Sequence, residues 1–308
     1  MADFQLTTPV AFLIFNRPDT TARVFEAIRQ AKPPKLLVVA DGPRPDRPDD
    51  VEKCKAARAI IDKVDWDCEV LTNYSDINLG CKNRVSSGLN WVFDTVEEAI
   101  ILEDDTLPEQ TFFQLCDIVL SKYREDERIM MISGTNFLGK WKSNIQSYHF
   151  SYYGGIWGWA SWKRAWKYYD RDMKLWADQE IQKRVRDVLA SHGQFMSREK
   201  IFWAAFKGNI DTWDYQWGFA RLVQSGLSIV PSVNLISNIG FGENATHTKS
   251  PNAELANLNT TSLEFPLKIN PFVAVDREYD KKMCDKLMKP QNYLFRRALQ
   301  RLNRLLSP

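Results

Sequence analysis

The sequence lacks the features that mark zinc-binding, disulfide-rich or nucleic-acid-binding proteins. Its five cysteines are widely spaced and form no CxxC pair, which argues against a zinc ribbon or a disulfide framework and favours a reducing compartment. Only three histidines occur. The formal net charge of +2 over 308 residues gives no reason to expect a nucleic-acid partner.

Long apolar runs are also missing. No segment approaches the roughly 20 consecutive apolar residues that a membrane-spanning helix requires. The apolar run at 10–15 is followed at once by Asn16 and Arg17 and is too short for a secretion signal. We therefore expect a cytoplasmic protein.

The first 133 residues alternate short apolar runs with longer segments of helical periodicity. Strands are predicted at 10–15, 35–40, 68–72, 99–102 and 129–133, and helices at 17–31, 50–64, 83–94 and 106–120. This alternation predicts an α/β fold in which a mainly parallel sheet is flanked by helices.

Four groups of residues lie at or just after the ends of predicted strands: Phe15–Arg17, Asp41–Arg44, Asn78–Arg84 and Glu103–Asp105. In an open parallel sheet, ligands bind outside the carboxyl ends of the strands. We therefore expect these four groups to converge on one crevice.

Three adjacent acids, Glu103, Asp104 and Asp105, repel one another and need an explanation. Mn²⁺ and Mg²⁺ prefer carboxylate oxygens and take their remaining ligands from water and substrate phosphates. Such a cation would spread the negative charge of a departing diphosphate. The alternative is that the acids cap the next helix, where Thr106 and Glu109 match a capping box.

The second half of the sequence has a different character. Residues 137–176 are aromatic and irregular, and nine of the eleven tryptophans fall between Trp141 and Trp217. Helices are predicted near 178–191, 198–207 and 214–224, a strand at 228–231 and a loop at 240–262. Between 293 and 306, leucines gather near one side of a basic helix. That helix either packs on the domain or makes a peripheral contact with the anionic inner face of a membrane.

Four segments, FLIFNRPD, VADGPR, NLGCKNRVSSGLNW and ILEDDTLP, resemble in this order the nucleotide-diphosphosugar glycosyltransferases of the Rossmann-like GT-A fold. The EDD motif is similar to that of the N-acetylglucosaminyltransferase I group, and GGIWGWASW and GFGENATHT resemble a bacterial branch of sugar transferases. The resemblance implies a GT-A domain over 1–275, with a nucleotide-sugar half (1–136) and an acceptor half (137–275), followed by a tail at 276–308.

The resemblance implies a metal-dependent glycosyltransferase. It would move a sugar, with inversion, from a nucleotide-diphosphate sugar, most naturally a UDP-sugar, to a hydroxyl of a glycan or lipid-linked acceptor. Its implied nucleotide-sugar contacts are Phe15, Asn16, Arg17, Asp41, Asn78, Gly80, Lys82, Arg84, Glu103 and Asp104. Asp105 and His247 would hold Mn²⁺ or Mg²⁺. Asp41 also fits a plain turn, residues 78–84 a solvated helix start, and His247 an ordinary surface position.

Two further assignments concern the acceptor. Tryptophan faces bind the C–H patches of sugars, so Trp157, Gly158 and Trp159 are predicted to form an acceptor wall, with an aromatic core as the alternative. Inversion needs a base for the acceptor hydroxyl, and Asp214 is the candidate, with Asp211 in reserve. The alternative is that Asp211 and Asp214 are a helix cap and its partner three residues on.

Two other functions stay open at this point. A sugar-1-phosphate nucleotidyltransferase has a related sheet, but such enzymes carry a glycine-rich loop after the first strand, and FNRPDTT has no glycine. A non-catalytic nucleotide- or sugar-binding module is the other alternative.

Overall fold

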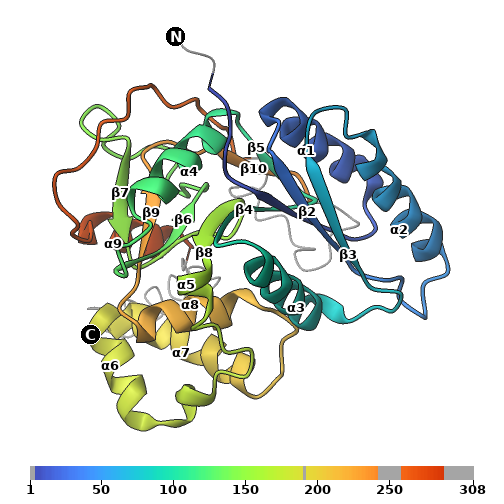
Figure 1. Cartoon of the computed structure of the whole chain (residues 1–308). Helices are drawn as coiled ribbons and strands as arrows, with labels where there is room; N and C mark the ends of the chain where they lie inside the picture. Colours follow the sequence, from blue (N-terminus) through green and yellow to red (C-terminus); the bar gives the residue numbers. More distant parts are fainter. Residues whose placement is uncertain (1–3, 190–191, 242–257, 288–308) are drawn as a thin grey trace, which may run out of the picture.

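The computed structural model describes residues 4–189, 192–241 and 258–287. An eight-stranded sheet in the order β3-β2-β1-β4-β8-β6-β9-β7 runs through this part of the chain (Figure 1). Its strands are β1 (Val10–Ile14), β2 (Lys35–Ala40), β3 (Glu69–Tyr74), β4 (Glu98–Glu103), β6 (Ile129–Ser133), β7 (Tyr148–Ser151), β8 (Trp159–Trp162) and β9 (Leu227–Pro231). The predicted α/β class is confirmed.

The predicted parallel arrangement is present on one side of the sheet. β1 pairs in parallel with both β2 and β4, and β2 pairs in parallel with β3. Side chains of β1 alternate between the two faces: Phe12 and Ile14 enter one hydrophobic cluster, whereas Ala11 and Leu13 enter another. Both faces of the sheet are therefore covered, which explains why these strands read as continuous apolar runs.

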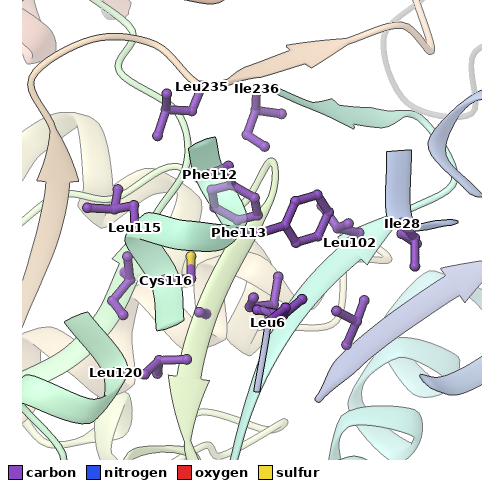
Figure 2. Close-up of a cluster of buried hydrophobic side chains, with 14 of the residues drawn as sticks. Leu6, Ile28, Leu102, Phe112, Phe113, Leu115, Cys116, Leu120, Leu235 and Ile236 are labelled. Carbon is purple, nitrogen blue, oxygen red and sulfur yellow. The ribbon is translucent and has the colours of Figure 1, made fainter. Parts of the chain in front are cut away.

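Helices cover the two faces. α1 (Pro18–Ala31) and α4 (Thr111–Lys122) contribute to the cluster on one face, which is continued by Ile60 and the 3₁₀ turn Ile61–Lys63. α2 (Asp49–Ala59) packs against α1. Figure 2 shows Phe112, Leu115 and Cys116 of α4 within that cluster. The opposite face is covered by α3 (Gly80–Thr95), α5 (Lys163–Trp166) and α8 (Asp214–Val223).

The prediction of a helix beginning at Thr106 is wrong. Residues Thr106–Pro108 form a short strand, β5, which pairs with β10 (Ile236–Asn238), and α4 begins only at Thr111. The hydroxyl of Thr106 accepts a hydrogen bond from the Glu103 backbone N–H at 2.9 Å. Pairing with a strand more than 100 residues away overrides the local capping pattern, which sequence periodicity does not reveal.

The prediction that residues 137–176 are irregular is also wrong. β8 inserts antiparallel between β4 and β6, at the middle of the sheet, and β7 forms one edge. All four residues of β8 are buried, so this strand shows no alternation of polar and apolar residues. The strand predicted at 228–231 is confirmed as β9.

A third cluster lies beside the sheet. It is built from the 3₁₀ turn Lys174–Ala177, α6 (Gln179–Leu189), α7 (His192–Phe206), α8 and α9 (Arg277–Leu287), around the buried Trp176. The start of the predicted tail is thus packed, and the Asp280 carboxylate accepts hydrogen bonds from the Ser151 hydroxyl and the Tyr152 N–H. Residues 288–308 lie outside the described residues, so membrane contact there stays a prediction. Within the described ranges, no helix combines the length and apolar character needed to cross a bilayer.

Candidate active site

The acid triplet lies where β1 and β4 end side by side, with Leu13 paired to Glu103. Arg17, three residues beyond β1, forms ion pairs with both Asp104 and Asp105. Asp104 also accepts a hydrogen bond from the Phe15 backbone N–H at 3.2 Å. The turn between β1 and α1 therefore holds the acids in place through one arginine and one peptide group.

Glu103 differs from its neighbours because one of its carboxylate oxygens finds no partner among the described residues. Its Oε1 atom is buried and makes no hydrogen bond within the described structure. Burial, and then the charges of Asp105 and Asp104, raise the pKa of this carboxyl above its ordinary value. A buried polar atom without a partner costs stability, and such atoms call for a specific explanation. A ligand or cation at this edge would provide one.

The acids suit a cation that is shared with substrate. The described residues hold no group of three or more histidine, cysteine, aspartate and glutamate side chains placed to bind a metal ion on their own. Mg²⁺ ordinarily uses one or two protein carboxylates and completes its shell with water and substrate phosphates. Asp105 and Glu103 are carboxylates of that kind, and Oε1 of Glu103 has no hydrogen-bond partner in the part of the chain that the structure describes. His247 lies outside the described residues, so its predicted ligand role stays a prediction.

The second and third strands end in a tightly bonded turn. Asp41 accepts hydrogen bonds from the Leu79 N–H at 2.9 Å and from the Asn78 amide at 3.0 Å. These are the contacts of a turn residue, so the predicted bond from Asp41 to a nucleotide base stays a prediction. The side-chain amide of Asn16 donates to Asp50 at 2.7 Å, which links the first turn to α2.

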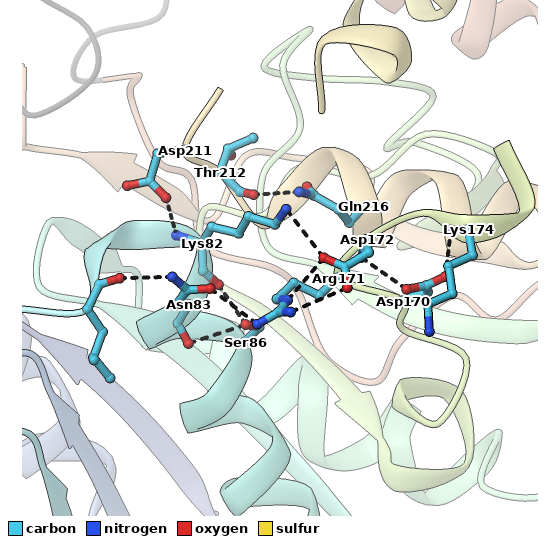
Figure 3. A network of polar contacts seen from close by, with 11 residues as sticks. Lys82, Asn83, Ser86, Asp170, Arg171, Asp172, Lys174, Asp211, Thr212 and Gln216 are labelled. Carbon is cyan, nitrogen blue, oxygen red and sulfur yellow. Dashed lines mark hydrogen bonds and ion pairs between the residues drawn. The ribbon is translucent and has the colours of Figure 1, made fainter. Parts of the chain in front are cut away.

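Asp211 stabilises the start of α3. Its carboxylate accepts hydrogen bonds from the Cys81 N–H at 3.0 Å and the Lys82 N–H at 2.9 Å. Gly80 has φ +76°, and a Cβ atom there would lie 2.9 Å from an Asp211 oxygen. The Lys82 ammonium lies 3.7 Å from Asp172 in the same network (Figure 3).

These contacts revise the alternative role of Asp211. It caps α3, a helix distant in sequence, and α8 has no side-chain cap. The alternative interpretation, in which Asp211 caps α8 and Asp214 is its partner three residues on, is therefore wrong.

Arg84 is predicted to contact the nucleotide-sugar, but the structure buries it against the sheet. Only 7% of the residue is exposed, and its guanidinium donates to the Ala40 carbonyl at 3.1 Å and the Asn73 side-chain oxygen at 2.8 Å. These bonds tie α3 to the ends of β2 and β3. The arginine therefore braces the strand ends and is not available to a diphosphate.

Of the three residues predicted to contact the acceptor, only one lines a cavity in the described structure. Trp159 is fully buried and stacks on Trp213 with ring centroids 5.6 Å apart. Gly158 is buried with φ +58°, and a Cβ atom there would lie 2.4 Å from Ile236. Both belong to the core, so the structure contradicts their predicted contact with an acceptor. Trp157 lines a cavity.

That cavity has a volume of about 340 Å³ and is bounded by residues 152–157 together with α7, α8 and α9. Asp214, Gly218 and Arg221 line it from one face of α8, at positions i, i+4 and i+7. The Asp214 carboxylate accepts a hydrogen bond from the Thr212 hydroxyl. The cavity is within the size range of small-molecule sites.

The cavity and the acid edge are electrostatically connected. The charge of Asp214 contributes to the raised pKa of Glu103, after burial and the two neighbouring acids. Burial, and then Glu103, Asp211 and Asp214, raise the pKa of the Cys81 thiol. These acids therefore lie near Cys81, at the start of α3.

Two arginines of the cavity, Arg198 and Arg221, were not anticipated from the sequence. The signal for Arg221 was present: it follows Trp217 by four residues, so the helical period places it beside a core position of α8. A charged residue at a core position of a helix indicates a specific role. Arg198 carries no comparable signal, because its environment comes from residues 152–157 and α8.

No protein-family model and no curated protein sequence matches the chain. Among solved structures, the chain is similar to the inositol-1-phosphate CTP transferase from T. maritima, with 9% identity, a TM-score of 0.39, and coverage of 92% of this chain and 98% of that one. It is also similar to a 4-diphosphocytidyl-2C-methyl-D-erythritol synthase from Anaerococcus prevotii (11% identity, TM-score 0.32, 56% and 78% covered). Mouse xyloside xylosyltransferase 1 matches with 9% identity and a TM-score of 0.26 over 42% and 54%. At these TM-scores the likenesses carry no argument about activity.

Proposed function

We propose that the protein is a glycosyltransferase that moves a sugar from a nucleotide-diphosphate sugar to a hydroxyl acceptor. The donor diphosphate would lie at the acid edge formed by Arg17 and Glu103–Asp105. The acceptor would occupy the cavity lined by Trp157 and α8.

The observation that carries this proposal is the position of Asp214. It lines the cavity, and it lies three residues after Asp211, whose carboxylate binds the N–H groups of Cys81 and Lys82 at the start of α3. A carboxylate between a donor site and an acceptor site can take the proton of the attacking hydroxyl. Attack from the side opposite the leaving diphosphate would invert the anomeric carbon.

The donor side of the site is proposed from charge and shape. Asp105 would hold Mn²⁺ or Mg²⁺, which would supply charge stabilisation for the leaving diphosphate. Lys82 adds a partly exposed positive charge, and its side chain is 18% accessible. Glu103 and Asp104 would contact metal-bound water or sugar hydroxyls, and Phe15 and Asn16 would border the nucleotide.

The direct test is release of nucleoside diphosphate from a panel of UDP-, GDP-, CDP- and dTDP-sugars, with and without Mn²⁺. A glycosyltransferase releases nucleoside diphosphate from one donor class, faster with metal. The panel includes Asp214→Asn as the variant and Asp187→Asn as its control, since Asp187 is an acid of α6 outside the cavity lining. Equal release by wild type and Asp214→Asn would contradict the assignment.

A nucleotidyltransferase would behave differently in the same assay format. It would consume a nucleoside triphosphate and a sugar 1-phosphate and release pyrophosphate. In this chain, only Phe15, Asn16 and Arg17 separate β1 from α1, and Arg17 is paired with the acids. Pyrophosphate release would favour the nucleotidyltransferase, and donor binding without any turnover would favour a binding module.

A further inference from the structure

Arg221 is a buried positive charge that has no acidic partner among the described residues. The residue is 4% exposed, and its Nε atom makes no hydrogen bond within the described structure. Its Nη1 donates to the uncharged hydroxyl of Ser228. No ion pair to Arg221 occurs among the described residues, although a buried charge ordinarily requires a paired partner.

A second arginine lies close to the first. Arg198 of α7 also lines the cavity, and its Nε atom is likewise buried without a hydrogen-bond partner. Its guanidinium carbon lies 5.2 Å from the ring centroid of Tyr153. Burial, and then the like charge of Arg198, lower the pKa of Arg221 to about 9. The two guanidinium groups therefore repel each other across the same space.

The rest of the cavity is largely apolar and aromatic. Its lining includes Ile156, Leu222, Val230 and Met283 as well as the rings of Tyr153 and Tyr279. Asp214 is the carboxylate in this lining, and its hydrogen-bond partner in the structure is Thr212. Two unneutralised guanidinium groups in such surroundings form a strong site for an oxyanion, because charge-assisted hydrogen bonds strengthen away from water.

We propose that Arg198 and Arg221 bind an anionic group, a phosphate or a carboxylate, on the molecule that enters this cavity. As a statement about the acceptor, this rests on the proposed function: the acceptor would be an acidic sugar or a sugar phosphate whose hydroxyl reaches Asp214. As a statement about an anion site, it stands on the cavity and the two arginines alone.

The two buried charges should lower the stability of the ligand-free protein, and a bound anion would offset that loss. Functional sites commonly hold groups that destabilise the free protein and are stabilised by ligand. Replacing Arg221 by methionine, which is of similar length and apolar, should therefore raise the thermal midpoint of the ligand-free protein. The same substitution should remove the stabilisation that an anion provides.

The test uses the full chain and four soluble probes: glucose 6-phosphate, glucuronate, inorganic phosphate and uncharged methyl glucoside. Binding is measured by calorimetry for wild type, Arg198→Gln and Arg221→Met. The matched control is Arg186→Gln, since Arg186 also stacks on an aromatic ring, 4.6 Å from the Phe195 centroid, but does not line the cavity. Vesicles of phosphatidylcholine with phosphatidic acid form a further arm, which separates a lipid phosphate from a soluble one.

We expect an anionic probe to bind wild type and the control alike, and each cavity variant to lose roughly tenfold or more in affinity. Methyl glucoside should bind no better to wild type than to the variants. The preferred probe identifies phosphate or carboxylate, and binding to vesicles alone identifies a lipid source. Unchanged anion binding in folded Arg221→Met, or no anion binding by wild type, would overturn the proposal.

The same series separates this proposal from the proposed function. UDP binding is measured in parallel and should be unaffected by Arg221→Met. If an anion binds through the two arginines while no donor sugar is turned over, the anion site stands and the glycosyltransferase assignment fails. If a donor is turned over but the arginine variants use acidic acceptors as well as wild type does, the anion site fails alone.

Discussion

The Nη1 atom of Arg17 lies 2.8 Å from the Oδ2 atom of Asp105. The carboxylate that we assign to a divalent cation is thus paired with a fixed positive charge of the chain itself. Arg17 also pairs with Asp104, whose side chain is 3% accessible. A cation that binds here must share Asp105 with Arg17 or replace it, and a displaced guanidinium would be free to contact phosphate.

Removing this arginine should destabilise the fold. In Arg17→Gln the buried Asp104 keeps one backbone hydrogen bond but loses its charged partner, which we expect to cost about 3 kcal/mol. Urea denaturation measures the free energy of unfolding. The control Arg29→Gln breaks an exposed ion pair with Glu26 and should cause no measurable loss. Equal stability of Arg17→Gln and wild type would show that the pair is dispensable.

Gly80 is expected to be intolerant of a side chain for two separable reasons. Both Gly80 and Gly208 have positive φ, at +76° and +70°, but an added Cβ has open space only at Gly208. Gly208→Ala should cost about 1 kcal/mol from backbone strain. Gly80→Ala should cost more, because Asp211 must move from the start of α3. Equal losses of stability in the two variants, measured by thermal denaturation, would mean that Asp211 moves away from the added Cβ at no measurable cost.

The pH dependence of stability should report on His149. Burial lowers its pKa from 6.5 to about 4, and neither ring nitrogen has a hydrogen-bond partner within the described structure. Between these values the unfolded chain binds a proton that the folded chain excludes, so stability falls as pH drops from 6.5 through 4. The loss amounts to about 3 kcal/mol.

His149→Leu should remove that component. Urea midpoints at pH 7 and pH 4.5 would then differ less in the variant than in wild type. An unchanged difference would mean that the folded protein accepts the proton without cost, and that water or an ion partners the ring.

Substitution of Asp214 and of Asp211 should have different effects, the first on the rate of sugar transfer and the second on stability. Asp214→Asn keeps the shape of the side chain but cannot accept a proton, so sugar transfer should fall by about 10²–10⁴-fold while donor binding persists. Asp211→Asn weakens two backbone hydrogen bonds of α3 and should lower stability first. Single-turnover rates, with donor affinity measured in parallel, distinguish the two variants. Loss of transfer only in Asp211→Asn would exchange their roles.

Much of the sheet was predictable because its strands are buried on both faces and are separated by periodic helices. β1, β2, β4 and β6 have the expected positions, and their ends bring Arg17 and the acid triplet together. The convergence at the strand ends follows from parallel topology alone. This is why the acid edge was accessible to sequence analysis.

The errors arise where distant segments decide the local structure. The tryptophan-rich strand β8 shows no alternation because both of its faces are covered, and β5 exists only through its pairing with β10. The sequence predicts that Trp159 contacts the acceptor sugar, but the residue lies in the core beside Trp213. The unpaired state of Arg221 depends on which residues surround it in space, which no spacing along the chain reveals.

The proposed function requires the acid triplet to bind a divalent cation together with a nucleoside diphosphate. Calorimetric titration of UDP, with and without Mn²⁺, tests it most directly in wild type, Asp105→Asn and the control Asp126→Asn, which alters an acid paired with Arg128 elsewhere. We predict that Mn²⁺ raises UDP affinity about tenfold or more in wild type and the control, and leaves it unchanged in Asp105→Asn. Equal manganese dependence in all three proteins, or none in wild type, would mean that Asp105 does not hold a cation for the diphosphate.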